Sequence, residues 1–143
     1  MRCRNTANNG KNRRGDVTLK TLTLPLKKKW FDLIKSGIKK EEYREASCYW
    51  TSRLLKYSLG EICKKATKSP RSVSNFEDFV KRHVNNGDWV NQFDKIVFTL
   101  GYPKADDSER RLEFRNPKIR IDEGKPEWGA EPNKLDFVIT WDA

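Results

Sequence analysis

The sequence predicts an α+β domain with about five to six strands, which suit a small β barrel, and about three flanking helices. Apolar and polar residues alternate, as in strands with one buried face, over residues 17–24, 95–100, 111–121 and 135–141. Apolar residues recur instead at helical spacing over residues 26–34 and 76–84. At 143 residues, the chain has the length of one compact domain. Short strands of this kind suit a barrel, which removes its own edges.

The first sixteen residues are predicted to be a disordered basic tail, and residues 17–143 to form the single domain. The tail has almost nothing apolar to bury, and its cations are Arg2, Arg4, Lys11, Arg13 and Arg14. Two interpretations stay open: the tail grips a phosphate backbone, or it is a leader without a role.

The first strand and the first helix are expected on either side of Pro25. Residues 17–24 alternate, with Leu22 and Leu24 on one face, and Pro25 is expected to end the strand. The helix that follows has an apolar stripe at Leu26, Trp30, Leu33 and Ile34. Gly37 fits the C′ position after this helix, so the chain is expected to turn there into an extended segment.

Two further helices are expected in the middle of the chain. Residues 46–57 show a weakly helical pattern, which predicts a helix or a helical turn with a long loop. An exposed loop is expected over residues 64–74, which are basic, rich in serine and contain a proline. The segment 74–77 has the S-x-x-E form of a capping box, and its helix is expected to stop near Asn85, before Asn86-Gly87.

The last third of the chain is expected to be β structure. Residues 95–100 alternate and are followed by the turn signal Gly101-Tyr102-Pro103. In residues 111–121 the inward positions change from even to odd numbers at Asn116-Pro117. A β-bulge there would keep both halves facing the core. Residues 135–141 then form a closing strand.

The charge balance favours an anionic partner, with nucleic acid as the first candidate. Lys and Arg number 30 against 20 Asp and Glu, a net charge of +10. The 5 Trp, 4 Tyr and 7 Phe residues offer stacking surfaces as well as core. The alternative interpretation is that the lysines only keep a small protein in solution.

Cofactors and membrane segments are not expected. The three cysteines (Cys3, Cys48 and Cys63) lack a C-x-x-C spacing and have only His83 as an imidazole partner, which argues against a zinc site. No segment has the apolar length of a membrane span, and the first twenty residues do not resemble a signal peptide. We therefore expect a monomeric, cytoplasmic protein without a cofactor or a membrane partner.

The most informative motif follows the first expected helix. Residues 37–44 read G-x-K-x-x-E-x-R, and Gly37, Lys39, Glu42 and Arg44 fill the fixed positions. This pattern, between a helix and β strands, resembles the signature of the ASCH (activating signal cointegrator homology) domain family. Residues 119–132 are similar to the loop that many bacterial and phage members carry between their last two strands. The resemblance covers roughly residues 19–141, although residues 58–92 match no family feature.

The resemblance implies a closed or nearly closed PUA-like (pseudouridine-synthase-archaeosine-transglycosylase-like) barrel with helices over one opening. It also implies a cleft beside the first helix that binds RNA or a nucleoside and is lined by Gly37, Lys39, Glu42 and Arg44. The ammonium suits a phosphate or a base carbonyl, the guanidinium suits paired acceptors, and the carboxylate suits an exocyclic amine. The structural alternative is that Glu42 pairs with Arg44 or Lys39 only to hold the bend.

A small hydrolase is the alternative function. Some ASCH proteins resemble acetylcytidine amidohydrolases, enzymes that use a Lys, a Thr nucleophile and a distant Glu. Here Lys39 matches, but Glu42 stands where the Thr is expected and would serve only as a general base for water. Glu123 or Glu127 would supply the distant acid. In a ribonuclease, Lys39 would stabilise phosphorane charge and Glu42 would take the 2′-hydroxyl proton. The missing Thr weakens the hydrolase interpretation, so the sequence favours a binding domain.

Trp128 is a further candidate for ligand binding. It lies in a loop flanked by Pro and Gly, where packing does not ordinarily demand so large a ring. Stacking on a base is one use for it, and plugging the barrel mouth is the other.

Overall fold

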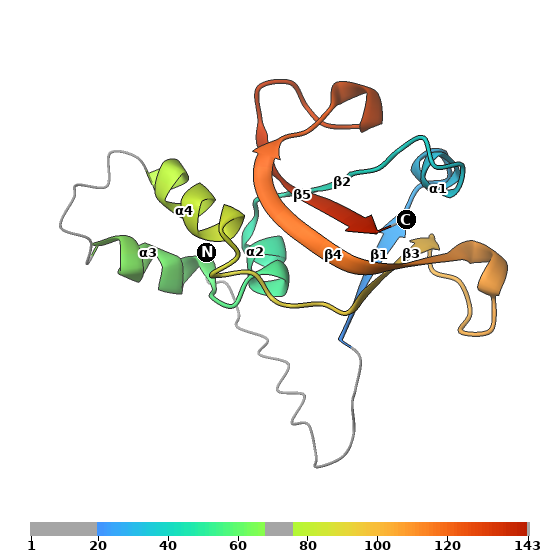
Figure 1. Cartoon of the computed structure of the whole chain (residues 1–143), viewed down its shortest axis with the longest axis horizontal. Coiled ribbons are helices and arrows are strands. Elements are labelled where there is room, and N and C mark those ends of the chain that lie inside the picture. Colours follow the sequence, from blue (N-terminus) through green and yellow to red (C-terminus); the bar gives the residue numbers. More distant parts are fainter. Residues whose placement is uncertain (1–19, 68–75, 143) are drawn as a thin grey trace, which may run out of the picture.

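The computed structural model describes residues 20–67 and 76–142, and it has an α+β architecture (Figure 1). The predicted tail and the first residues of the predicted first strand lie outside the described residues. The strands are β1 (Thr21–Leu26), β2 (Glu42–Glu45), β3 (Lys95–Leu100), β4 (Arg111–Glu123) and β5 (Leu135–Asp142). The described α-helices are α1 (Lys28–Lys35), α2 (Cys48–Leu54), α3 (Leu59–Thr67) and α4 (Phe76–Asn85). Two short 3₁₀ turns are η1 (Ser108–Arg110) and η2 (Pro126–Trp128).

The five strands form one sheet in the order β1-β3-β4-β5-β2. β1 and β3 are parallel, and the other neighbours are antiparallel. The long strand β4 curves around the sheet, so that the sheet is strongly coiled (Figure 1). It is nevertheless open, because β1 and β2 stand at its two edges. The prediction of an α+β fold is confirmed, whereas closure into a barrel is not.

The predicted bulge in β4 is confirmed. The pairing register shifts between Arg115 and Lys118, and Asn116 has a positive φ of 52°. Residues 111–115 of β4 pair with β3, whereas β4 pairs with β5 at Arg115 and then from Lys118 to Glu123. The bulge therefore lies where the strand changes partners, and it keeps apolar side chains on the core side in both halves. These side chains are Leu112, Phe114, Ile119 and Ile121.

The main core lies between one face of the coiled sheet and the helices. α4 packs on β4, and α1 contacts β3. Each fully buried Leu, Ile or Phe contributes about 1.5–3 kcal/mol relative to exposure. The most deeply buried core residues are Leu22, Leu24, Leu54, Ile62, Val84, Ile96, Phe98, Phe137 and Ile139.

The boundary between β1 and α1 differs from the prediction. Pro25 does not end the strand, and Leu26 is the last buried residue of β1 rather than part of the helical stripe. A proline is tolerated here because β1 is an edge strand, where the missing N–H leaves no ladder hydrogen bond unmade. α1 begins at Lys28 and buries Phe31 and Ile34.

The helical middle of the chain was only partly predicted. α2 begins after Ser47, whose hydroxyl accepts the Trp50 N–H at 3.3 Å. α4 ends at Asn85 as expected, with Gly87 at φ +86°. The expected loop over residues 64–74 is wrong up to residue 67, because α3 extends to that point, and its remainder lies outside the described residues.

Candidate functional site

The turn after α1 determines which residues of the signature are buried. Gly37 has a φ of +80° and its N–H donates to the Ile34 carbonyl at 3.0 Å. The Ile38 N–H donates to the Leu33 carbonyl at 3.1 Å, which completes the Schellman pattern expected from a C′ glycine. The side chain of Ile38 then points to solvent, 60% exposed, and that of Lys39 points inward, 1% exposed.

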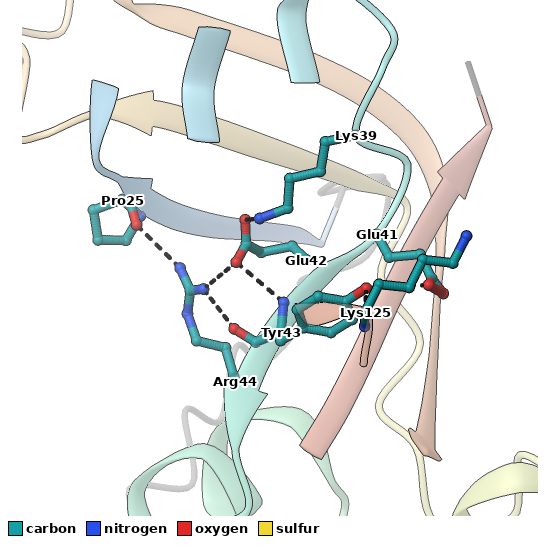
Figure 2. A network of polar contacts seen from close by, with 7 residues as sticks. All are labelled: Pro25, Lys39, Glu41, Glu42, Tyr43, Arg44 and Lys125. Atoms are coloured by element: carbon teal, nitrogen blue, oxygen red, sulfur yellow. Dashed lines mark hydrogen bonds and ion pairs between the residues drawn. The ribbon is translucent and has the colours of Figure 1, made fainter. Parts of the chain in front are cut away.

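Glu42, the first residue of β2, is the centre of a buried polar network (Figure 2). Its Oε2 accepts a hydrogen bond from Lys39 Nζ at 3.0 Å. Its Oε1 accepts from Arg44 Nη1 at 3.0 Å and from the Tyr43 N–H at 3.1 Å. Glu42 is 5% exposed, so two cations share one carboxylate with little contact to water. The charges of these three side chains sum to +1.

Arg44 also joins the two edge strands of the sheet. Its Nη2 donates to the Pro25 carbonyl of β1 at 3.0 Å, and its Nη1 donates to the Tyr43 carbonyl at 2.8 Å (Figure 2). A side chain therefore bridges the seam that a closed barrel would close with backbone pairing. Its side chain is 15% exposed, which makes Arg44 the most accessible member of the network.

Lys39 is surrounded by aromatic rings as well as by charge. Its Nζ lies 4.4 Å from the ring centroid of Trp30 and 5.7 Å from that of Tyr43. Burial lowers the pKa of Lys39; the carboxylate of Glu42 opposes this shift, and the charge of Arg44 adds to it. A buried amine with a lowered pKa beside a carboxylate is typical of functional sites, although structural ion pairs show such shifts too.

The connection between β4 and β5 packs over these rings. A Cβ on Gly129, which has a φ of +102°, would lie 2.8 Å from the ring of Trp30. A Cβ on Gly124 would lie 2.5 Å from Ala130 Cβ and 2.7 Å from Tyr43 Cε1. The connection therefore approaches both rings so closely that only glycine fits at these two positions.

We expect Gly124→Ala to lower the free energy of unfolding by about 1–3 kcal/mol, because the new methyl group overpacks the contact with Tyr43. Gly60→Ala is the matched control: it lies in α3 with 4.0 Å to the nearest atom, and should stabilise by about 0.4–1 kcal/mol. Urea denaturation of both variants measures the difference. Equal stabilities would show that the connection does not pack as described.

The hydroxyl of Tyr43 holds a second polar cluster on the other side of β2. It donates to Glu41 Oε1 at 3.2 Å and accepts the Lys125 N–H at 3.0 Å. Glu41 also accepts from Arg120 Nη2 of β4 at 2.6 Å. Burial raises the pKa of Tyr43 to about 12, despite the opposing hydrogen bond from Lys125. Tyr43 thus connects β2 to the β4–β5 connection.

The structure brings three of the five predicted site residues into direct contact with one another. Lys39, Glu42 and Arg44 form direct contacts, and the shared face expected for Glu42 and Arg44 is present. Trp128 belongs to the neighbourhood only through a small cluster with Tyr43, Ala130 and Val138, and Lys125 Nζ lies 4.3 Å from its ring. Gly37 shapes the turn and presents no side chain.

The ion pairs of Glu42 with Lys39 and Arg44 are those expected if Glu42 serves only to hold the bend after α1. The same contacts fit a ligand site, so the role of the network stays a prediction. The suggested distant acids, Glu123 and Glu127, are both exposed, and neither is a described partner of Lys39.

Sequence reasoning missed the two rings around Lys39. Trp30 was assigned only to the helical stripe, and Tyr43 is a variable position of the signature. Strand alternation gave no signal for Tyr43 either, because it places the residue between the motif's Glu and Arg on the opposite side of the strand from both. The closeness of Trp30 depends on the fold and had no local signal.

The described residues contain neither a candidate metal site nor a candidate membrane-spanning helix. Within residues 20–67 and 76–142, no group of three or more His, Cys, Asp or Glu side chains is placed to hold a metal ion. None of the helices described has both the length and the apolar character needed to cross a bilayer. A comparison of the chain with models of known protein families, with curated proteins and with solved structures gives no match.

Proposed function

We propose that this chain is an ASCH-type domain that binds RNA or a modified nucleoside at the network of Lys39, Glu42 and Arg44. One observation carries the proposal: three ionised side chains of the signature share one buried site. Burying such charges costs several kcal/mol each, and their mutual attraction often only offsets that cost. A fold that needed only stability would be served as well by apolar residues there, so the charges favour a role in recognition.

The chemistry of the network suits a nucleobase or a phosphate. Lys39 has three donors, of which Glu42 takes one in the described part of the chain. Arg44 offers a planar fork, and the site carries a net charge of +1. The rings of Trp30 and Tyr43 would bury an apolar base face beside these donors.

In this proposal, a ligand can reach Lys39 only when the β4–β5 connection moves. The ammonium is covered by the two rings, on which the β4–β5 connection packs. A ligand would first meet Arg44 and then reach Lys39 as the connection shifts. A PUA-like relationship is part of the same proposal: Arg44 joins β1 and β2 where a closed barrel would pair them. The cytoplasmic location and the monomeric state stay predictions.

A small hydrolase acting on an acylated nucleoside, or on RNA, is the second candidate. The observation that favours it is the lowered pKa of Lys39 beside Glu42. An amine with a lowered pKa gives up its proton more readily than an ordinary lysine, which favours a role as base or nucleophile, and Glu42 would activate water. The exposed positions of Glu123 and Glu127 give no support to a distant catalytic acid.

Mass spectrometry of the ligand separates the two candidates. The protein is incubated with a panel of modified nucleosides and with a structured RNA, and both ligand and product are analysed. Binding predicts that the ligand is retained unchanged. Product formed at substoichiometric protein, and absent with Lys39→Met, would instead make the protein an enzyme. If wild-type protein retains no member of the panel and converts none, the proposal fails.

A further inference from the structure

A second arginine, like Arg44, donates a hydrogen bond to the free edge of β1. Arg53, in the last turn of α2, donates from Nη2 to the Thr23 carbonyl of β1 at 3.4 Å. Arg44 donates to the Pro25 carbonyl of the same strand. Carbonyls two residues apart lie on one edge of a strand, separated by roughly 6.6 Å. Two guanidinium groups therefore stand side by side along the free edge of β1.

Aromatic rings hold both guanidinium groups in place. The ring centroid of Trp50 lies 5.2 Å from Arg44 Cζ and 5.8 Å from Arg53 Cζ. Tyr49 meets Trp50 edge to face at 4.9 Å, and its hydroxyl accepts from Arg53 Nη1 at 3.0 Å. Contacts of this kind orient the planar forks before any ligand arrives, which reduces the entropy cost of binding.

The charge of Arg53 is uncompensated in the described part of the chain. Its hydrogen-bond partners there, a carbonyl and a phenol, are neutral, and no described carboxylate lies within ion-pair distance of it. Together Lys39, Arg44 and Arg53 against Glu42 give a charge of +2, three cations less one anion. A pair of oriented guanidinium groups with excess positive charge suits a phosphate group.

The exposed ring of Tyr49 offers a surface on which a base next to such a phosphate can stack. Tyr49 is 61% exposed, although Trp50 beside it is largely covered. An aromatic face next to a phosphate-binding cation is the arrangement by which proteins hold single-stranded nucleic acid.

We propose that Arg53, with Arg44 and Tyr49, forms a phosphate and stacking subsite, so that the ligand is a nucleotide within single-stranded RNA rather than a free nucleoside. This inference rests on the proposed function, because it extends the site at Lys39 along the seam between β1 and β2. The base reaches the buried network, Arg53 holds the adjoining phosphate, and Tyr49 stacks on the neighbouring base.

The test compares ligands that differ only in phosphate. Affinities are measured by calorimetry for cytidine, adenosine, their 5′-monophosphates, and an eight-nucleotide RNA of cytidine and adenosine with its DNA counterpart. Wild-type protein should bind each monophosphate about ten- to a hundredfold more tightly than its nucleoside, as expected for one charge-assisted contact. Arg53→Gln should remove this difference and leave nucleoside affinity unchanged. Arg110→Gln, which neutralises an exposed arginine in η1, is the matched control and should retain the difference.

Two further readouts use the RNA. Arg53→Gln should reduce the slope of log affinity against log salt by about 0.7, the value for one phosphate of a single strand. Tyr49→Leu should weaken RNA binding by about five- to a hundredfold, the range for one stacked base. Equal binding of the DNA would keep the phosphate subsite and overturn the assignment to RNA.

The failures of the two proposals are distinguishable. Equal affinity of wild-type protein for nucleoside and monophosphate, or a phosphate preference that survives Arg53→Gln, would overturn the subsite and leave the site at Lys39 standing. If no probe binds wild-type protein, the proposed function fails and the subsite fails with it.

Discussion

Glu42→Gln should lower the free energy of unfolding by about 3 kcal/mol, because the neutral amide leaves two cations without their counter-charge. For a domain of this size, that corresponds to a fall in melting temperature of about 10 °C. Loss of the proton from Lys39 limits the cost, since burial already lowers the pKa of Lys39. The difference between variant and wild type should therefore shrink as the pH rises toward about 10. Thermal unfolding at several pH values measures both effects.

Glu113→Gln is the matched control for this change. Glu113 also pairs with a lysine, Lys95, at 3.5 Å, but its side chain is 57% exposed. Exposed pairs of this kind contribute about 0–1 kcal/mol. A melting temperature for Glu42→Gln that equals that of Glu113→Gln would contradict the buried network.

The second large effect is a loss of stability at alkaline pH that depends on Tyr43. The pKa of Tyr43 is raised to about 12 in the folded protein, whereas an unfolded tyrosine ionises near pH 10. Between about pH 10 and pH 12 the folded state therefore binds more protons than the unfolded state, and stability falls as the pH rises. Two pKa units correspond to about 3 kcal/mol. Below about pH 10 both states are protonated and Tyr43 contributes no pH dependence.

Tyr43→Phe should remove this part of the alkaline loss. Chemical denaturation from pH 8 to pH 12 measures it as the difference between variant and wild type, which cancels the opposite contribution of Lys39. Tyr102→Phe, at a ring that is 94% exposed, is the control and should follow the wild-type profile. An alkaline loss that persists unchanged in Tyr43→Phe would show that the phenol is not buried between Glu41 and Lys125.

Features that depend only on residues close together in the sequence were predictable from it. The helix end at Gly37 follows from the conformational freedom of one glycine, and the structure shows the expected positive φ. The bulge at Asn116-Pro117 follows from the change of phase between Phe114 and Ile119, since both have to face the core. Such signals need no knowledge of which strands pair.

The missed helix α3 had a local signal too. Ser58-Leu59-Gly60-Glu61 has the same S-x-x-E form that marked α4, and the Ser58 hydroxyl accepts the Glu61 N–H at 3.2 Å. The basic and serine-rich composition of residues 64–74, together with their proline, favoured a loop. Burial of Ile62 in the core outweighs these preferences, and tertiary packing of that kind is not visible in a local pattern.

Sheet closure and the surroundings of Lys39 depend on contacts between distant segments. β1 carries alternating residues that would suit a closed barrel, yet the pairing leaves β1 and β2 at opposite edges of the sheet. Lys39 is buried because Trp30 and Tyr43 lie over it, and a connection about 90 residues later packs on both rings. The motif identified the polar residues of the candidate site but not their burial.

Recognition of a ligand by Lys39 is tested most directly by measuring the affinity and the melting temperature of Lys39→Met together. Methionine fills a similar volume without the charge, so the melting temperature should stay within about 3 °C of wild type or rise. Affinity for the RNA or nucleoside that wild-type protein retains should fall by about ten- to a hundredfold. Lys95→Met, which removes the same charge from an ion pair elsewhere, should bind normally. A large fall in melting temperature with unchanged affinity of the folded protein would show instead that Lys39 only holds the bend after α1.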